Sequence, residues 1–222
     1  MKSLRGIHMP FMLGGRTFNA TGLQFDQNRP VFKLDINYTK FDKFLRFVCR
    51  RLSQWLSPTW IQPVLLLLGP RLLLPDTVIL KQRVEKDWRT MTAFDNEEKT
   101  YTMYQRLQGS LMPYCYGKAF CGTIPALIFS QARGKALLEL TSEERVRALP
   151  AIQEGYEKLS EVGLVHGDPR LDHVFYDTES KRVMFIDFDL AMPEEGVRAS
   201  RFTNDGEWYD LRNELLESVN GH

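Results

Sequence analysis

Two short apolar runs near the C-terminal end of the chain predict a β-hairpin. Val174-Phe175-Tyr176 and Val183-Met184-Phe185-Ile186 are rich in β-branched and aromatic residues, and the polar segment 177–181 separates them. One carboxylate, Asp168, precedes the hairpin, and a second, Asp187, directly follows its last strand. Two acids that converge on one cleft suit phosphoryl transfer, because one can align the attacking hydroxyl while the other holds a metal ion.

Helical spacing of apolar residues predicts two helices in the first half of the chain. Over residues 41–56 the apolar side chains recur every three or four positions, with arginines and lysines on the other faces. The second helix is predicted over residues 95–108, and Glu97 lies on its apolar stripe. A carboxylate on an apolar stripe needs a partner if it is buried, so Glu97 becomes a candidate site residue.

The remaining patterns predict a small sheet followed by further helices. Residues 1–39 are interpreted as loops with two short strands, and five more strands are expected further on, at residues 64–68, 72–74, 77–84, 112–117 and 124–130. Thr141-Ser142-Glu143-Glu144 has the form of a capping box, and the helix that it opens either kinks at Pro150 or gives way to a second helix. A last helix is expected over residues 207–219.

Composition and charge narrow the class of protein. The net charge of +1 gives no reason to expect nucleic acid as a partner, and the three cysteines lack metal-ligand spacing, which fits a reducing compartment. The most apolar stretch, residues 64–80, is interrupted by glycine, proline and charged residues, so no transmembrane segment is expected. No signal peptide is apparent after Met1. We therefore expect a soluble, cytoplasmic protein.

The two acidic segments, taken in order, resemble a known superfamily. His166-Gly167-Asp168, then His173 five residues after the aspartate, the hairpin, and Ile186-Asp187-Phe188-Asp189 are similar to the catalytic loop and metal motif of protein-kinase-like phosphotransferases. Within this superfamily, the residues of both motifs most resemble those of the aminoglycoside and choline phosphotransferase branch and of fungal kinase-like proteins. The resemblance covers roughly residues 64–190.

This resemblance implies an α+β fold with two lobes, a small antiparallel-sheet N-lobe and a reduced helical C-lobe. Residues 61–132 would form the N-lobe, and residues 133–222 the C-lobe with the catalytic and metal loops. Residues 1–60 would be an N-terminal extension of uncertain structure that carries the helix 41–56. Only 31 residues follow Ala191, so we expect either a reduced member of the family or an incomplete gene product.

The resemblance also implies roles for single residues, with ATP and Mg²⁺ as cofactors. Asp168 would be the catalytic base and Asp187 the metal ligand. Lys81, at the end of an apolar strand, would grip the nucleotide phosphates and pair with Glu97, or with Glu98 if the helix is rotated.

Three features bear on whether the site is active. Arg170 stands where a cation would stabilise the transferring phosphate. His173 replaces the asparagine that the family uses as a metal ligand, and an imidazole nitrogen suits Mn²⁺ better than Mg²⁺. The favoured alternative is a histidine that does not bind metal and instead joins loop and strand through hydrogen bonds. No glycine-rich phosphate loop is found before Lys81, because the nearby Gly69 is followed by a proline that lacks an amide donor.

Three functional hypotheses follow. The favoured one is ATP- and Mg²⁺-dependent phosphoryl transfer to a hydroxyl of a protein or of a small molecule, which the sequence leaves open. The second is a catalytically weak or inactive pseudokinase that acts as a binding module, favoured by His173 and by the missing glycine loop. The third is a membrane adaptor built on the basic amphipathic helix 41–56, which could also bind a partner. The favoured interpretation of this helix is that it packs on its own domain and leaves its basic face in solvent.

Overall fold

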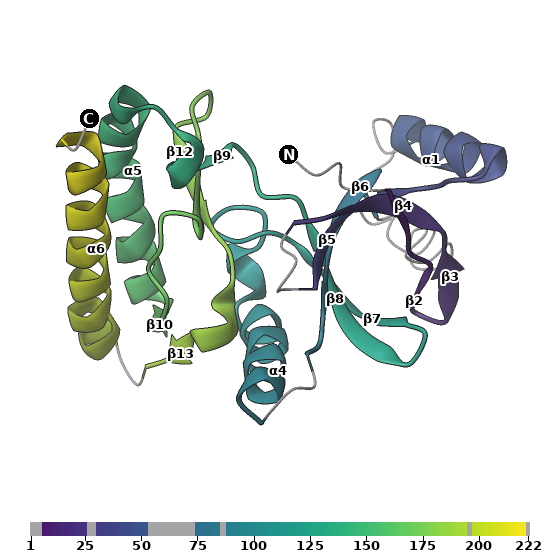
Figure 1. Cartoon of the computed structure of the whole chain (residues 1–222), viewed down its shortest axis with the longest axis horizontal. Helices are drawn as coiled ribbons and strands as arrows, with labels where there is room; N and C mark the ends of the chain where they lie inside the picture. Colours follow the sequence, from purple (N-terminus) through teal and green to yellow (C-terminus); the bar gives the residue numbers. More distant parts are fainter. Residues whose placement is uncertain (1–5, 26–29, 53–73, 85–87, 195–196, 221–222) are drawn as a thin grey trace. The chain divides into compact units, whose positions relative to one another are not determined.

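The computed structural model describes residues 6–25, 30–52, 74–84, 88–194 and 197–220 (Figure 1). The fold is of the α+β class, and the chain forms two compact units. Unit 1 comprises Met1–Glu85 and Cys115–Gln131, and unit 2 comprises Lys86–Tyr114 and Ala132–His222.

Unit 1 is built on one antiparallel sheet of eight strands, in the order β1-β4-β5-β6-β8-β7-β2-β3. Figure 1 shows that this sheet is strongly curved. Side chains alternate along β5, so that Phe32, Leu34 and Ile36 are buried while their neighbours are more exposed. The bounds are β1 Ile7–His8, β2 Phe11–Leu13, β3 Arg16–Phe18, β4 Ala20–Gln24, β5 Val31–Ile36, β6 Thr77–Gln82, β7 Cys115–Cys121 and β8 Ile124–Ser130.

The sheet differs from the predicted one in its first half. Residues 1–39 were expected to hold two strands, but five strands lie there and share the sheet with β6, β7 and β8. Four of these five strands have at most five residues, and so short a run carries little periodic signal.

The predicted strand 77–84 is confirmed as β6, which ends at Gln82. The predicted strand 64–68 lies outside the described residues, as do residues 72 and 73. Strands β5 and β8 pair with β6 along its two edges. The strand predicted over 124–130 is confirmed as β8, whereas β7 begins at Cys115, three residues after the predicted start.

Helix α1, Lys40–Leu52, confirms the amphipathic helix in unit 1 as far as the described residues reach. Thr39 and Asp42 cap its first turn reciprocally: the Asp42 amide donates to Thr39 Oγ1, and the Thr39 amide donates to Asp42 Oδ2. Residues 53–56 of the predicted helix lie outside the described part.

Unit 2 contains the other three described helices, α4 (Trp88–Met103), α5 (Ser142–Glu161) and α6 (Val197–Asn220). The capping box at Thr141 and Glu144 is confirmed, and α5 continues through Pro150 as one helix. Helices α5 and α6 run antiparallel side by side (Figure 1), with Arg145 donating to Ser218 at one end and Asn204 donating to Ser160 at the other. Helix α6 begins ten residues before the predicted start, and α4 begins seven residues before it.

Short strands and turns connect these helices. The predicted hairpin is confirmed as β11 and β12, and β9 extends it to three strands, while β10 pairs with β13. Their bounds are β9 Lys135–Ala136, β10 Leu164–Val165, β11 Val174–Asp177, β12 Arg182–Phe185 and β13 Met192–Pro193, with 3₁₀ turns at Gln105–Leu107, Leu137–Glu139 and Phe188–Leu190. None of the described helices is both long enough and apolar enough to cross a bilayer.

Candidate functional site

The candidate site lies in unit 2, and its first loop depends on a glycine. Strand β10 delivers the chain to His166, and Gly167 then adopts a φ of +85°, which L-residues with side chains rarely adopt. A Cβ atom at this position would lie 2.1 Å from the carbonyl oxygen of Leu190. Gly167 therefore lets the loop with Asp168 pass directly against the segment that follows Asp187.

The second loop begins at Asp187, at the end of β12. Its backbone is left-handed, with φ 64° and ψ 60°, a conformation that aspartate tolerates better than most residues. The 3₁₀ turn Phe188–Leu190 follows. The side-chain amide of Asn96, on α4, stabilises this turn by donating to the carbonyl oxygens of Asp189 and Ala191, at 2.9 and 2.8 Å. Strained backbone that is held by its surroundings is common at functional sites.

These loops bring together three of the predicted site residues, Asp168, His173 and Asp187. His173 Nδ1 lies 3.2 Å from Asp168 Oδ2, and His173 Nε2 lies 3.3 Å from Asp187 Oδ2. Each of the three residues offers one atom that could bind a metal ion, and these three atoms lie within 4.8 Å of one another. His173 is buried, whereas the two aspartates keep partial exposure.

The hydrogen bonds of His173 fix the direction of its ring. Nδ1 lies 3.2 Å from the Asp168 carbonyl oxygen, which can only accept, so this bond requires a proton on Nδ1. The opposite nitrogen, Nε2, is then directed at Asp187. A ring that donates through one nitrogen to an oxygen and presents the other to a carboxylate has the arrangement of a metal-binding histidine.

His166 positions the Asp168 loop as a neutral residue. Its Nε2 lies 2.9 Å from the Ile186 carbonyl, to which it donates, and its Nδ1 accepts from the Asp168 amide at 3.3 Å. Burial lowers the pKa of His166 to about 4, which agrees with a ring that accepts at one nitrogen and donates at the other. The ring packs on Phe188, with 4.8 Å between the ring centroids, so His166 ties both loops together.

Glu207 of α6 holds the same loop from the other side. Its Oε1 accepts from the Gly167 amide at 2.7 Å, and burial raises the pKa of this carboxyl to about 7. Sequence reasoning missed Glu207 and Asn96 as positioning residues. Their partners lie 40 and more than 90 positions away along the chain, and no local pattern indicates such contacts.

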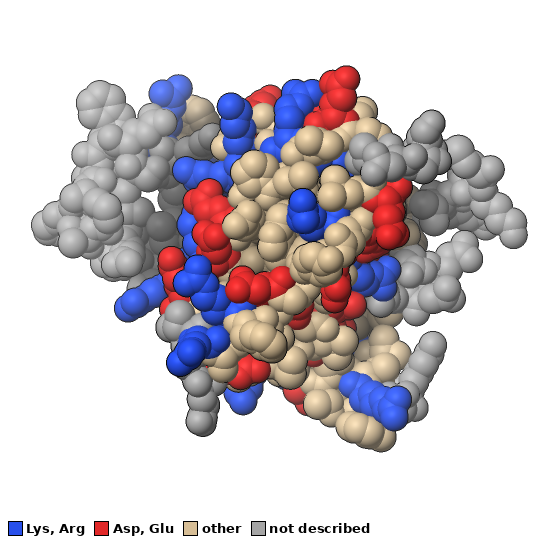
Figure 2. Space-filling view, turned by 90° about the vertical axis from the view of Figure 1, so that its left-hand side faces the viewer, with Lys and Arg blue, Asp and Glu red and all other residues tan. Residues whose placement is uncertain are grey.

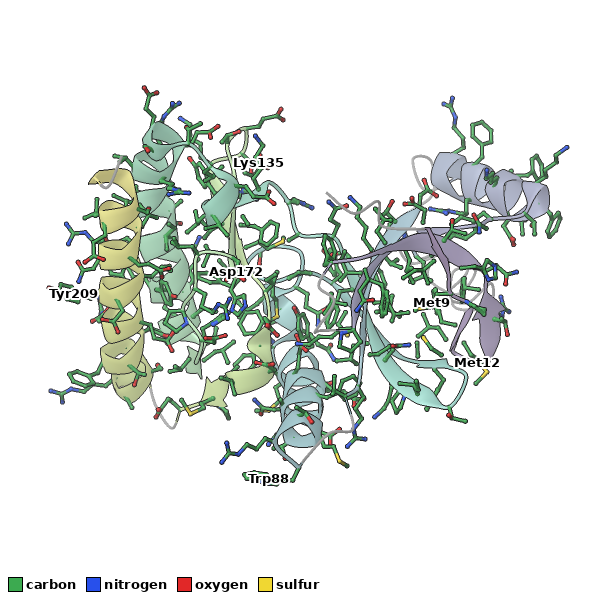
Figure 3. All side chains as sticks on the ribbon, viewed as in Figure 1. Met9, Met12, Trp88, Lys135, Asp172 and Tyr209 are labelled. Atoms are coloured by element: carbon green, nitrogen blue, oxygen red, sulfur yellow. The ribbon has the colours of Figure 1, made fainter. Side chains whose placement is uncertain are left out.

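Arg170, the predicted charge stabiliser, binds a neighbouring acid. Its Nε donates to Asp172 Oδ1 at 2.9 Å, and a second guanidinium nitrogen donates to Asp172 Oδ2 at 3.0 Å. Asp172 lies on the loop between β10 and β11, where Figure 3 labels it. This two-point bond raises the pKa of Arg170, and both side chains remain about half exposed, so the guanidinium is held close to the loop yet open to solvent.

The predicted phosphate clamp is divided between the units. Lys81 lies on β6, a strand inside the sheet of unit 1, opposite Leu127 of β8. Glu97 lies on α4 in unit 2 and is 2% exposed, as expected for an acid on the apolar stripe, while Glu98 is partly exposed. The pairing of Lys81 with either glutamate stays a prediction.

The chemistry of the three clustered side chains fits a divalent metal ion. Two carboxylates and one imidazole nitrogen form a mixed oxygen and nitrogen donor set, and partial exposure of both acids leaves room for other ligands. Such a set suits Mn²⁺ or Zn²⁺ better than Mg²⁺, which favours oxygen ligands alone.

Comparison with known proteins adds no family to this description. The chain matches no protein-family model, and no curated protein matches it.

Proposed function

We propose that this protein is a metal-dependent phosphotransferase that transfers a phosphoryl group from ATP to a hydroxyl. The observation that carries the proposal is the cluster of Asp168, His173 and Asp187, in which two acids from separate loops lie around one buried imidazole. Their order along the chain and the hairpin between them agree with the resemblance to kinase-like phosphotransferases.

The roles follow from what each side chain contacts. Asp187 and His173 would hold the metal ion, which when bound neutralises charge on the transferring phosphate. Asp168, whose carboxylate is partly exposed and has Oδ2 3.2 Å from His173 Nδ1, would align the proton of the acceptor hydroxyl. Arg170 would place a permanent positive charge beside these acids.

The position of Lys81 supports a nucleotide as the phosphate donor. Strands β4, β5 and β6 pair in sequence, Lys81 lies near the end of β6, and α4 with Glu97 follows. In kinases a phosphate-covering loop precedes the strand lysine, and a helix with its glutamate partner comes after it. The segment 25–30, which connects β4 and β5, contains no glycine, so backbone contacts to phosphate would differ from those of a glycine-rich loop.

A second candidate function, a non-catalytic binding module, is favoured by the position of His173. A ring that touches both acids can itself bridge them when it is protonated, and a protonated imidazole would take the place of a metal ion. Such a protein would keep the fold of the site and transfer no phosphate.

Removal of each aspartate tests the proposal, because their roles differ. With Asp168→Asn we expect ATP binding to persist and turnover to fall by about 10²-fold or more. With Asp187→Asn we expect metal-dependent ATP binding itself to weaken. Asp205→Asn, an exposed aspartate on α6, is the matched control and should change neither quantity. Binding is measured by thermal shift with ATP and with Mg²⁺ or Mn²⁺, and turnover by phosphate transfer or ATP hydrolysis.

The outcomes separate the two candidates. Absence of turnover in the wild type, with ATP stabilisation that only Asp187→Asn abolishes, supports the binding module. If neither aspartate variant changes ATP binding or turnover, both functions are refuted and the site is a resemblance of motif alone.

A further inference from the structure

Helix α1 of unit 1 carries three phenylalanines whose rings are largely in solvent. Phe41, Phe44 and Phe47 are 66%, 61% and 58% exposed. A spacing of three residues places them along one side of the helix. Exposed aromatic side chains are usual when isolated, but three in a row on one short helix form an apolar strip that calls for a function.

The opposite side of α1 is already fixed to unit 1. Asp42 is buried and accepts from Thr39 at the start of the helix. Arg46 donates to Asp76 at 2.8 Å, and its guanidinium lies 4.1 Å from the centroid of the Tyr38 ring. The Tyr38 hydroxyl in turn donates to the Leu74 carbonyl. The helix is thus held by its polar side, and the phenylalanines face outward in a preformed conformation.

Positive charge surrounds this aromatic strip. Lys40, Lys43 and Arg51 are exposed, and the Arg51 guanidinium lies 5.6 Å from the centroid of the Phe47 ring. The helix sequence holds five cations and one acid, whereas the whole chain has a net charge of only +1. By contrast, Figure 2 shows lysines and arginines mixed with acids on the face of unit 2 that α6 contributes.

We propose that the outward face of α1 binds the surface of an anionic lipid membrane. Phenylalanine rings beside lysines are the composition of helices that lie in the plane of a bilayer, with the rings at the headgroup and acyl boundary and the cations on lipid phosphates. A protein-binding surface is instead depleted of lysine in its centre. A second copy is disfavoured because two such helices would bring like charges together. The proposal does not depend on the phosphotransferase activity.

Vesicle flotation with the full chain tests this proposal. Vesicles of phosphatidylcholine alone are compared with vesicles in which about a third of the lipid is phosphatidylserine. We expect binding at least about tenfold stronger to the anionic vesicles, and weakening as salt rises from about 0.1 M to about 0.5 M. Phe41→Ser/Phe44→Ser/Phe47→Ser should abolish binding, and Lys40→Glu/Lys43→Glu should remove the preference for anionic lipid.

Helix α6 supplies matched controls for both changes. Phe202 is 84% exposed, and Arg198 and Arg201 are exposed near it. Phe202→Ser and Arg198→Glu/Arg201→Glu should leave vesicle binding unchanged. Circular dichroism checks that each variant is folded, and Phe44→Ser alone, which removes one exposed ring, provides a milder test if the triple variant is not.

Several results would overturn the proposal. They are wild-type protein that does not float with anionic vesicles, equal loss of binding in the α1 and α6 variants, and binding that is insensitive to both α1 changes. A dimer in light scattering that dissociates on the phenylalanine change, or RNA that competes fully with vesicles, would assign the face to a second copy or to nucleic acid instead.

Discussion

The two units differ in what they bury. Among the described residues, the buried side chains of unit 1 are apolar except for that of Asp42. Unit 2 buries seven polar or charged side chains: Glu97, Thr100, Ser160, His166, His173, Ser200 and Asn204. An apolar interior holds a sheet together by burial alone, whereas buried polar groups must each find a partner and therefore fix specific geometry.

The polar interior of unit 2 connects its helices to the candidate site. Asn204 of α6 donates to Ser160 Oγ and to the Leu164 carbonyl, which lies just before the Asp168 loop. Ser200 donates to the Ser160 carbonyl, and Glu207 accepts from Gly167. Helix α6 is thereby bonded both to α5 and to the loop that carries Asp168. We therefore expect substitutions of buried apolar residues in unit 1 to lower the free energy of unfolding, and substitutions of buried polar residues in unit 2 to change the geometry of the candidate site.

The largest effect is expected from a cavity in unit 1. Leu34 is fully buried in the core of the sheet, so Leu34→Ala should reduce the free energy of unfolding by about 3–5 kcal/mol, through lost burial and the void left behind. Chemical denaturation of the full chain measures this change. At temperatures where the variant is folded, metal affinity measured by calorimetry should remain that of the wild type. A large loss of metal affinity would contradict the division of roles between the units.

The next effect is expected at Gly167. Gly167→Ala would place a Cβ 2.1 Å from the Leu190 carbonyl at a positive φ, so the loop must shift, at a cost of about 2–4 kcal/mol. Metal affinity should fall at least about tenfold, because Asp168 and Asp187 separate. Gly206→Ala on α6 is the control: beyond its chain neighbours and the backbone of its own helix, no atom lies within 4 Å of its added Cβ, so it should stabilise the helix by about 0.5–1 kcal/mol. Equal effects of the two changes would contradict the close approach at Gly167.

Much of unit 2 could be predicted from the sequence because its signals are local. The hairpin of β11 and β12 follows from two apolar runs and a polar turn, and α5 follows from its capping box. The approach of Asp168 and Asp187 to one another was predicted from their order around the hairpin, whereas His173 was implied by the family resemblance. In unit 1 the same reasoning gave β6 and β8 but expected two strands where residues 7–36 form five, since four of these five have at most five residues and so carry little periodic signal.

The supporting residues of the site could not be predicted for a related reason. Asn96 and Glu207 act on backbone groups, and any loop offers such groups whatever its sequence. Only the packing of α4 and α6 decides which carbonyl or amide they reach. The sequence likewise indicated that Arg170 places a positive charge near the site. It did not indicate that the Asp172 carboxylate would accept two hydrogen bonds from the Arg170 guanidinium.

A smaller effect, tied to pH, is expected at Glu207. Burial raises the pKa of this carboxyl to about 7 from an ordinary value near 4.5, so between these values the folded protein holds a proton that the unfolded chain has lost. The stability contributed by Glu207 therefore falls as pH rises through this window. Glu207→Gln keeps an acceptor for the Gly167 amide and carries no charge. It should match the wild type near pH 4 and be more stable by about 1–3 kcal/mol above pH 7. A constant difference across the window, measured by denaturation at several pH values, would contradict this assignment.

The smallest effect, and the sharpest test of the polar interior, concerns metal preference. His173 presents Nε2 toward Asp187 at 3.3 Å, and a nitrogen ligand favours Mn²⁺ over Mg²⁺. His173→Asn replaces this nitrogen with an amide oxygen, so we expect Mg²⁺-dependent ATP binding to strengthen and the preference for Mn²⁺ to fall about tenfold, roughly 1.4 kcal/mol. Titration calorimetry with each metal and ATP measures both affinities. His8→Asn, at an exposed histidine in unit 1, should leave them unchanged. If both variants retain the wild-type ratio of Mn²⁺ to Mg²⁺ affinity, His173 serves only to bridge the two aspartates and does not bind the metal.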